Sequence, residues 1–157
     1  MTSRLCTVCE EHLPADAFRK GSNDTCTWCQ WNDPGQRARA RYGDKLKADK
    51  KRAEGDKRLY ASESEFVDWY CSQDDCCHYC GLTRLEAKSL RLKRGSFGYF
   101  VSWDIDRVDS SRPYELGNMV LSCFMCNMAK AGYFSEDEAL LLGAAVRTII
   151  NRRLKLK

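Results

Sequence analysis

The sequence predicts a small α+β fold that is stabilised by zinc. Eight of the ten cysteines form four pairs in which two residues separate the partners. Two short segments with the alternating pattern of β-strands stand between the last two pairs, and two helix-start patterns flank them. A chain of 157 residues, 43% of them hydrophobic, is long enough for one core with an appended module.

The composition excludes several classes of protein. No apolar run approaches the roughly 18–20 residues that a membrane span needs. The first residues carry no apolar stretch typical of a signal peptide, so we expect a cytoplasmic protein. Thiols stay reduced in the cytosol, where paired cysteines more often bind metal than form disulfides. The net charge of +4 does not by itself indicate a polyanionic partner.

The cysteine pairs have the spacing of zinc knuckles. Each pair places two thiolates on a tight turn, and two pairs together supply the four tetrahedral ligands that Zn²⁺ prefers. The first module, residues 1–36, is too short to bury a sufficient core, which a structural zinc would offset. The predicted ligands are Cys6, Cys9, Cys26 and Cys29 for one zinc, and Cys77, Cys80, Cys123 and Cys126 for the other.

Other uses of these cysteines remain open. The pairs could be redox-active or simply buried thiols, although neither explains four pairs in one chain. Cys71 and Cys76 are left over. Cys76 could replace Cys77 as a ligand, and His12 could replace a cysteine of the first set. Four sulfur ligands leave no open position for water, so we expect structural rather than catalytic zinc.

A strongly basic segment follows the first cysteine module. Residues 37–58 hold ten basic and four acidic residues, which is a net charge of +6. Because the segment has few apolar residues, we interpret residues 37–60 as an exposed helix or a mobile arm. It could contact phosphates or serve only as a solvated linker. The predicted contact residues are Arg37, Arg39, Arg41, Lys45, Lys47, Lys50, Lys51 and Arg52, with Arg91, Lys93, Arg94 and Lys130 further along the chain.

Two helices have clear start signals. Residues Ser62 to Glu65 form a capping box, and Phe66 and Tyr70 follow at helical spacing. Residues Ser135 to Glu138 form a second capping box, which opens a C-terminal helix over residues 135–157. The acidic start and basic end of this helix complement its dipole. We expect both helices to pack against the core.

Between the two helices the pattern predicts a β-hairpin and a short helix. The first strand runs from Tyr99 to Asp106, with apolar residues on one face and polar residues on the other. The second strand covers residues 118–122 and follows a loop rich in turn formers. Residues 123–130 have the pattern of a helix start. We assign residues 61–134 to one core domain.

This domain resembles the HNH, or ββα-metal, endonucleases. In that family a β-hairpin and a helix hold one divalent metal ion, and a zinc site often pins their ends together. The second cysteine set is placed to be that zinc site. The residues that carry the resemblance are Asp106, Arg107, Val108, Asp109, Tyr114, Asn118, the run from Cys123 to Asn127, and Lys130.

The resemblance implies roles for several of these residues. Asp106 and Asn127 would bind the catalytic Mg²⁺ or a similar ion, since a charged and a neutral oxygen suit part of its shell. Asn118 would steady the hairpin. Arg107 departs from the family, because most members have a histidine there as general base. Arginine cannot accept a proton near neutral pH. Either the site is inactive, or another residue activates the water and Arg107 binds the phosphate.

A tyrosine is the first hypothesis for that other residue. Tyr79, between the cysteines of the third pair, is the leading candidate, and Tyr99, Tyr114 and His78 follow. An ordinary tyrosine has a pKa of about 10, so a metal ion and Arg107 would have to lower the pKa of the base. Tyr79 could instead only pack against its zinc knuckle.

The resemblance implies an enzyme that hydrolyses phosphodiester bonds in double-stranded DNA. The role that we expect is that of a Type II restriction endonuclease, encoded by a bacterium or phage. A homodimer would match the symmetry of a palindromic site. The alternatives are a free-standing homing endonuclease of a phage or intron, a catalytically inactive DNA-binding zinc protein, and a zinc-dependent protein-interaction module.

Overall fold

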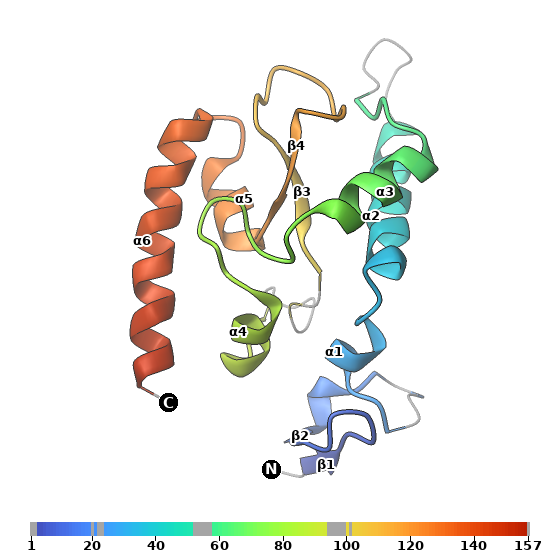
Figure 1. The fold of residues 1–157 in the computed structure, drawn as a ribbon, viewed down its shortest axis with the longest axis vertical. Coiled ribbons are helices and arrows are strands. Elements are labelled where there is room, and N and C mark those ends of the chain that lie inside the picture. The colour runs from blue at the N-terminus through green and yellow to red at the C-terminus, as the bar shows by residue number, and fades with distance from the viewer. Residues whose placement is uncertain are drawn as a thin grey trace.

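The computed structural model describes residues 3–19, 21, 24–51, 58–93, 100 and 102–156. These residues form a small mixed α+β fold with two separate antiparallel sheets of two strands each. Figure 1 shows the first sheet in an N-terminal module at one end of the molecule, and the second sheet at the centre of a larger unit among helices. The predicted α+β class is therefore confirmed.

The N-terminal module is built around cysteines rather than around a large apolar core. Strands β1 (Ser3–Leu5) and β2 (His12–Pro14) pair antiparallel, and a turn of 3-10 helix (Ala15–Ala17) and helix α1 (Thr27–Gln30) follow. Its buried apolar residues are Cys6, Leu13, Ala17, Phe18, Cys26 and Trp28. A core this small does not fold alone, which is why modules of this size depend on metals or disulfides.

The basic segment forms a regular helix, α2 (Pro34–Asp49). Asp33 caps this helix by accepting a hydrogen bond from a backbone N–H of the first turn, and proline occupies the first helical position, where its missing N–H costs nothing. Of the two structures expected for this segment, the described residues show the helix rather than the mobile arm. The helix is not fully exposed, because Arg37, Ala38 and Asp49 are buried.

Helix α2 packs along α3 (Glu63–Ser72). The contact includes Tyr42 of α2 and Phe66 of α3, whose ring centroids are 5.6 Å apart. At the end of α2, the Asp49 carboxylate accepts hydrogen bonds of 3.0 and 2.7 Å from the backbone N–H groups of residues 58 and 59. The C-terminal end of α2 is thereby fixed to the chain that leads into α3.

Capping boxes begin three of the helices. The predicted boxes at residues 62–65 and 135–138 begin α3 and α6 (Glu136–Lys155). A third box, at residues 83–86, begins α4 (Arg84–Ser89), a short helix that the sequence pattern did not reveal. In each box a serine or threonine oxygen accepts a hydrogen bond from a backbone N–H, and a glutamate accepts one from the capping residue.

The predicted hairpin is formed by β3 (Asp104–Arg107) and β4 (Met119–Ser122). The two strands are antiparallel, in a register that places Asp106 opposite Val120. Helix α5 (Phe124–Lys130) begins directly after β4 and contacts both β3 and α6. This order of strand, strand and helix is the ββα arrangement that the resemblance implied.

Two strand boundaries differ from those expected. The first strand was expected from Tyr99, but β3 begins at Asp104; Tyr99 and Val101 lie outside the described residues. The second strand was expected from Asn118, but β4 begins at Met119. The side chain of Asn118 is hydrogen-bonded to the loop between the strands, so this residue closes the loop instead.

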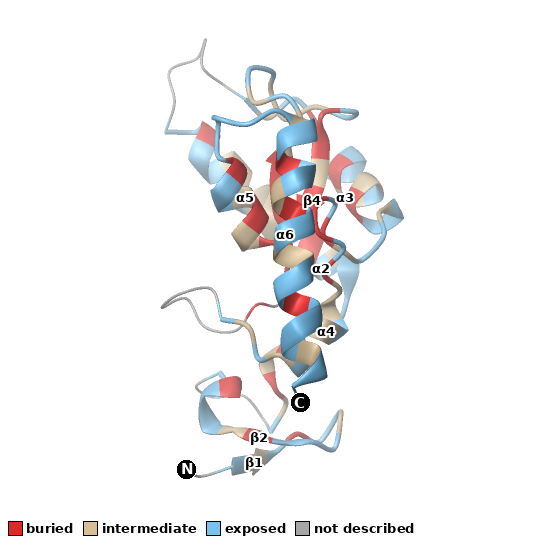
Figure 2. Cartoon of the chain, turned by 90° about the vertical axis from the view of Figure 1, so that its left-hand side faces the viewer, coloured by how far each residue is buried: buried red, intermediate tan, exposed pale blue. Residues whose placement is uncertain are grey.

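The larger hydrophobic core lies among the hairpin, α3, α5 and α6. Its largest fully buried side chains include Trp103, Phe66, Leu82 and Ile105. Figure 2 shows buried segments along the hairpin and on the inward faces of the helices, while α6 keeps an exposed outer face. Among the described residues, no helix combines the length and apolarity that a membrane span requires.

Helix α6 comes very close to the turn at residues 77–80. A Cβ atom at Gly143 would lie 2.2 Å from the carbonyl oxygen of Tyr79. One turn further along α6, Arg147 donates a hydrogen bond of 2.7 Å to the carbonyl oxygen of Cys80. The C-terminal helix is therefore held against the cysteine turn that carries Tyr79.

We expect Gly143→Ala to lower the free energy of unfolding by about 1–3 kcal/mol, because the added methyl group would overlap the Tyr79 backbone. Gly43→Ala is the matched control, since a Cβ at this position in α2 meets nothing within 4 Å. The control should gain about 0.5–1 kcal/mol from improved helix propensity. Denaturant unfolding measures both, and equal stability of the two variants would contradict the close packing.

Candidate functional site

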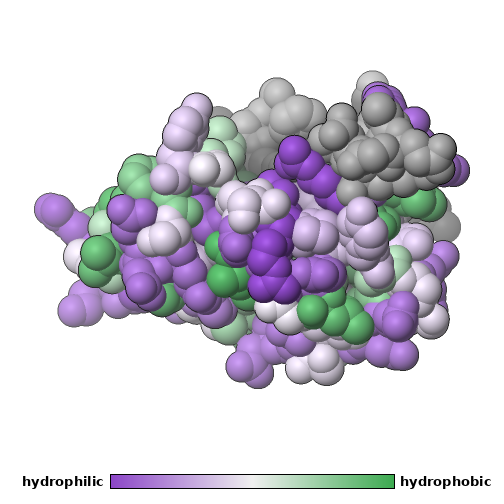
Figure 3. All heavy atoms as spheres, turned by 90° about the horizontal axis from the view of Figure 1, so that it is seen from above, coloured by the Kyte–Doolittle hydropathy of each residue, from purple (hydrophilic) through white to green (hydrophobic). Residues whose placement is uncertain are grey.

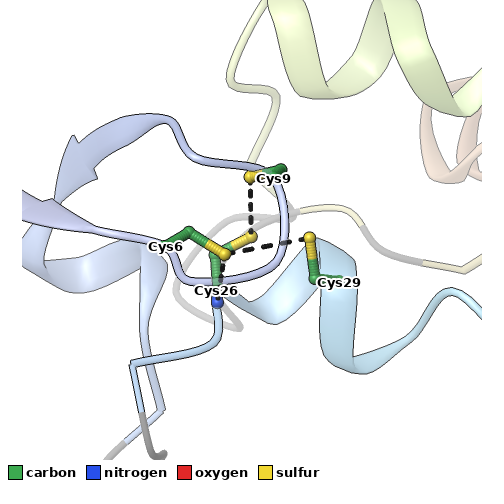
Figure 4. Close-up of side chains that lie close together, drawn as sticks. All are labelled: Cys6, Cys9, Cys26 and Cys29. Atoms are coloured by element: carbon green, nitrogen blue, oxygen red, sulfur yellow. Dashed lines mark hydrogen bonds between the residues drawn. The ribbon is translucent and has the colours of Figure 1, made fainter.

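The first cysteine cluster has the dimensions of a tetrahedral metal site. The four Sγ atoms of Cys6, Cys9, Cys26 and Cys29 all lie within 4.8 Å of one another (Figure 4). The Cys6–Cys29 and Cys9–Cys26 sulfur pairs are 3.9 and 4.0 Å apart. A tetrahedron with zinc–sulfur bonds of about 2.3 Å has sulfur–sulfur edges of about 3.8 Å. The cluster could therefore hold zinc.

Local hydrogen bonds prepare Cys6 for metal binding. Burial acts to raise the pKa of Cys6, but backbone hydrogen bonds, chiefly from Cys26, outweigh it and lower the pKa to about 6. The thiolate, which is the form that binds metal, then predominates at neutral pH. Burial raises the pKa of Cys26 and Cys29, so a metal ion would displace their protons. His12, an alternative ligand, is not part of the cluster.

The second cluster is fully buried and joins two distant parts of the chain. Its ligand atoms come from Cys77, Cys80, Cys123 and Cys126 and also lie within 4.8 Å of one another. Hydrogen bonds from the thiols of Cys123 and Cys126 lower the pKa of Cys77. Cys76 is not part of this cluster, and Cys71 is exposed. The cluster could hold a zinc that pins the turn at residues 77–80 to the start of α5.

Asp106 lies on β3 beneath this turn, with its side chain buried. The Tyr79 hydroxyl donates a hydrogen bond of 2.6 Å to Asp106 Oδ2, and the Lys130 ammonium lies 3.4 Å from the same oxygen. Within the described part of the chain, no hydrogen bond reaches Asp106 Oδ1. One carboxylate oxygen is therefore fixed by protein groups, and the other is left for a ligand.

The Tyr79 hydroxyl is bound to the carboxylate of an expected metal ligand. Burial, together with the hydrogen bond to Asp106, raises the pKa of Tyr79 well above its ordinary value. The phenol acts as a donor to Asp106 and holds its proton there. The contact orients Asp106, and it makes Tyr79 a poor base in this arrangement. The position of Tyr79 between two cysteines predicted its place beside the zinc knuckle, but nothing in the sequence indicates Asp106 as its partner.

Asn127, the other expected metal ligand, lies on α5. Its side-chain Nδ2 donates a hydrogen bond of 3.3 Å to Asp104 Oδ2. Asp104 is buried on β3, and the Arg41 guanidinium of α2 lies 3.5 Å from its Oδ1. Because residues two apart on a strand share a face, Asp104 and Asp106 both face the α5 side. Asp104 was not among the predicted site residues, although its position two residues before Asp106 was a usable signal.

Asn118 holds the loop of the hairpin together. Its Oδ1 accepts a hydrogen bond of 2.9 Å from the Asp109 N–H, and its Nδ2 donates to the carbonyl oxygens of Asp109 and Pro113 at 3.1 and 2.9 Å. The side chain is almost completely buried. These bonds fix the path of the chain from β3 to β4, which is the role that the resemblance implied.

Arg107 and Tyr114 lie together at the end of β3. The Arg107 guanidinium carbon is 5.2 Å from the centre of the Tyr114 ring, and the Lys45 ammonium of α2 is 3.8 Å from it. Lys45 also donates a hydrogen bond of 3.0 Å to the carbonyl oxygen of Ile105. Tyr114 is thus flanked by two cations.

His78, another candidate for the general base, is hydrogen-bonded to Glu136 at 2.8 Å.

Several of the predicted DNA-contacting cations turn inward. Arg37 is buried and donates to the carbonyl oxygens of residues 31 and 32 and to Asp75. Lys130 is completely buried and donates to the Arg107 carbonyl oxygen at 2.7 Å. Arg37 and Lys130 therefore do not present their charges on the surface, which corrects their expected role.

Arg41 and Lys45 are partly buried and donate hydrogen bonds to Ser102 and to the Ile105 carbonyl oxygen. The remaining predicted cations divide into two groups. Arg52 and Arg94, like the base candidate Tyr99, lie outside the described residues. The exposed ones are Arg39, Lys47, Lys50, Lys51, Arg91 and Lys93. Of these, Lys93 forms an ion pair of 2.6 Å with Asp16 of the N-terminal module. Figure 3 shows the end of the molecule opposite this module, where hydrophilic side chains predominate over scattered apolar ones.

Comparison with known proteins supports the resemblance seen in the sequence. No protein-family model matches the chain, and no curated protein matches it. A solved structure of the rare-cutting HNH restriction endonuclease PacI, described for its mechanism of DNA perturbation, matches with a TM-score of 0.59. The two chains are 28% identical, and the match covers 93% of this chain and 94% of the other. The fold thus resembles that of an HNH nuclease.

We expect Cys126→Ser to reduce bound zinc from two ions per chain to one and to lower the melting temperature, because it removes a buried ligand of the second cluster. Elemental analysis of the purified protein gives the zinc content. Cys71→Ser is the control, since this exposed cysteine lies outside both clusters and its variant should keep both ions. Two zinc ions in the Cys126→Ser variant would disprove the ligand assignment.

Proposed function

We propose that this protein is a DNA endonuclease of the HNH type that hydrolyses phosphodiester bonds in double-stranded DNA. The observation that carries the proposal is the position of Asp106 and Asn127 within a ββα unit whose junction between β4 and α5 lies at a four-cysteine cluster. The similarity to the HNH restriction endonuclease PacI over 93% of the chain supports the same activity.

The donor groups fit a hard divalent cation such as Mg²⁺. Asp106 would supply a charged oxygen through Oδ1 and Asn127 a neutral one, while water and DNA phosphate would complete the shell. The bound ion would neutralise the scissile phosphate and the leaving 3′-oxygen. Tyr79 and Lys130 hold the Asp106 carboxylate in place through its Oδ2. The two cysteine clusters would each hold a structural zinc.

Arg107 would bind phosphate and leave proton abstraction to another group. Its guanidinium is permanently charged and can donate, but not accept, hydrogen bonds. Tyr114 is the best placed of the described candidates, because it lies beside Arg107 and its side chain is not committed to a carboxylate. Tyr79 donates to Asp106, and His78 is paired with Glu136. We therefore assign the base to Tyr114 and an orienting role to Tyr79.

The exposed cations of α2 would contact the DNA backbone. Arg39 and Lys47 are exposed on this helix, and Lys50 is exposed directly after it. The inward cations Arg41 and Lys45 reach the strand that carries Asp106. Phosphate contacts of this kind give affinity and register but no sequence information. Helix α2 would therefore place the duplex relative to the catalytic residues.

The biological role that we propose is that of a Type II restriction endonuclease acting as a homodimer on a palindromic site. A homing endonuclease would use the same residues and differ in the length and symmetry of its site. Arg107 favours one further candidate, a DNA-binding protein without catalysis, because it stands where the family usually has its histidine base.

Cleavage of long genomic duplex DNA tests the proposal. With Mg²⁺ we expect a few discrete fragments, with a chelator none, and sequencing of the fragment ends would give the site and its symmetry. Binding in a gel-shift assay without cleavage in any of several divalent metals would support the non-catalytic alternative and overturn the proposed activity.

We expect Asp106→Ala to abolish this cleavage while zinc content and most DNA affinity persist, because the substitution removes the charged ligand of the catalytic ion. Asp68→Ala is the matched control, since Asp68 is exposed on α3 and its loss leaves the site intact. Cleavage rate, bound zinc and DNA affinity are measured for both variants. Normal cutting by Asp106→Ala would show that the active site lies elsewhere.

We expect Tyr114→Phe to slow single-turnover cleavage by about 10²–10⁴-fold, the usual effect of losing a general base. Tyr79→Phe should instead raise the metal concentration needed for cleavage, because Asp106 loses the hydrogen bond that orients it. Each variant is assayed over a range of Mg²⁺ concentrations. The opposite pattern, with the large rate loss in Tyr79→Phe, would return the base role to Tyr79.

A further inference from the structure

Asp104 links the candidate metal ligand on α5 to the basic helix α2. It precedes Asp106 by two residues on β3, and its side chain is also buried. One carboxylate oxygen accepts a hydrogen bond of 3.3 Å from the Nδ2 of Asn127, and the other lies 3.5 Å from the Arg41 guanidinium. The proposed chemistry assigns no role to this carboxylate.

An asparagine that binds a metal ion must be oriented in a way that an aspartate need not be. Only the amide oxygen can bind a cation, because the NH₂ group on the other branch is purely a donor. A half-turn about the last side-chain bond exchanges the two groups with little change in shape. A neighbour that can bond only to the NH₂ group removes this ambiguity.

We infer that Asp104 is a positioning residue that fixes the Asn127 amide with its oxygen turned away from Asp104 and available to the catalytic ion. An ionised carboxylate has no donor, so it can pair with the amide nitrogen and not with the amide oxygen. The inference rests on the proposed function, because it concerns the metal centre assigned there. It adds a residue that acts through Asn127 rather than on the substrate.

Arg41 keeps Asp104 in this role. Its Nε donates a hydrogen bond of 2.8 Å to the Ser102 hydroxyl, and an Nη donates one of 3.2 Å to the Ser102 carbonyl oxygen. The guanidinium is thereby fixed beside the Asp104 carboxylate. Its positive charge opposes the approach of a second cation to Asp104. The Asp104 carboxylate therefore accepts the hydrogen bond from the Asn127 amide instead of binding a metal ion itself.

The test is a titration of the zinc-loaded full-length chain with Mn²⁺, in which electron paramagnetic resonance reports the free ion. We expect Asp104→Asn to weaken Mn²⁺ binding by about 10- to 100-fold, the usual effect of losing a partner behind a metal ligand. Zinc content should be unchanged. Asp68→Asn is the charge-matched control, since Asp68 is exposed on α3, and its Mn²⁺ affinity should match that of the wild type.

A double-mutant cycle separates positioning from a general structural effect. In an Asn127→Asp background, either orientation of residue 127 presents an oxygen, so the orienting bond is not needed. The second carboxylate would also face Asp104 at close range. We therefore expect Asp104→Asn to leave Mn²⁺ affinity unchanged or to raise it in this background, opposite to its effect beside Asn127. A merely structural role would weaken binding in both backgrounds.

The outcomes distinguish this inference from the proposed function. Wild-type Mn²⁺ affinity in Asp104→Asn, with affinity lost in Asp106→Ala, overturns the inference and leaves the nuclease standing. Mn²⁺ binding that depends on both Asp106 and Asp104, without DNA cleavage by the wild type, overturns the nuclease and supports the inference. Equal Mn²⁺ binding by the wild type and Asp106→Ala overturns both.

Discussion

The cluster of Cys77, Cys80, Cys123 and Cys126 is the constraint on which the rest of the site depends. A two-stranded hairpin such as β3–β4 is marginally stable alone in water. The cluster fixes the end of this hairpin to a turn more than forty residues earlier in the chain. The turn carries Tyr79, which bonds to Asp106, and the residue after the last cysteine is Asn127. Under the proposed function, a zinc ion at this cluster would therefore fix the positions of both candidate metal ligands.

The basic helix α2 supports the site from the opposite side. A run of cations with few apolar neighbours is typical of a solvated surface, and the exposed cations Arg39 and Lys47 have that character. Others point inward: the Arg41 guanidinium lies 3.5 Å from Asp104, and Lys45 donates a hydrogen bond to the Ile105 carbonyl oxygen. Buried carboxylates and carbonyl groups need such partners, because unpaired polar groups are costly in a low-dielectric interior. Helix α2 therefore supports the hairpin through its inward cations and presents other cations to solvent.

The features that could be predicted are those encoded locally. The spacing within each cysteine pair, the capping boxes and the two strand segments of the hairpin each depend on residues within a few positions, and the structure contains all of these features. The contacts of Tyr79 with Asp106, of Asp104 with Asn127 and of Arg37 with Asp75 could not be predicted, because the two residues of each contact lie at least 23 positions apart in the sequence. Helix α4 was missed because six residues give too short a pattern for periodicity to show.

The charges around the two buried carboxylates also bear on what a bound ion could do. Asp106 is matched by Lys130, and Asp104 is matched by Arg41, so the protein balances these two negative charges before any metal binds. Under the proposed function, the charge of a divalent ion would then be directed mainly at the DNA phosphate rather than consumed by the protein. Such preorganised charge stabilises a transition state without reorganisation during the reaction. Because of this charge balance, we expect the protein alone to bind the divalent ion weakly and the protein–DNA complex to bind it more tightly.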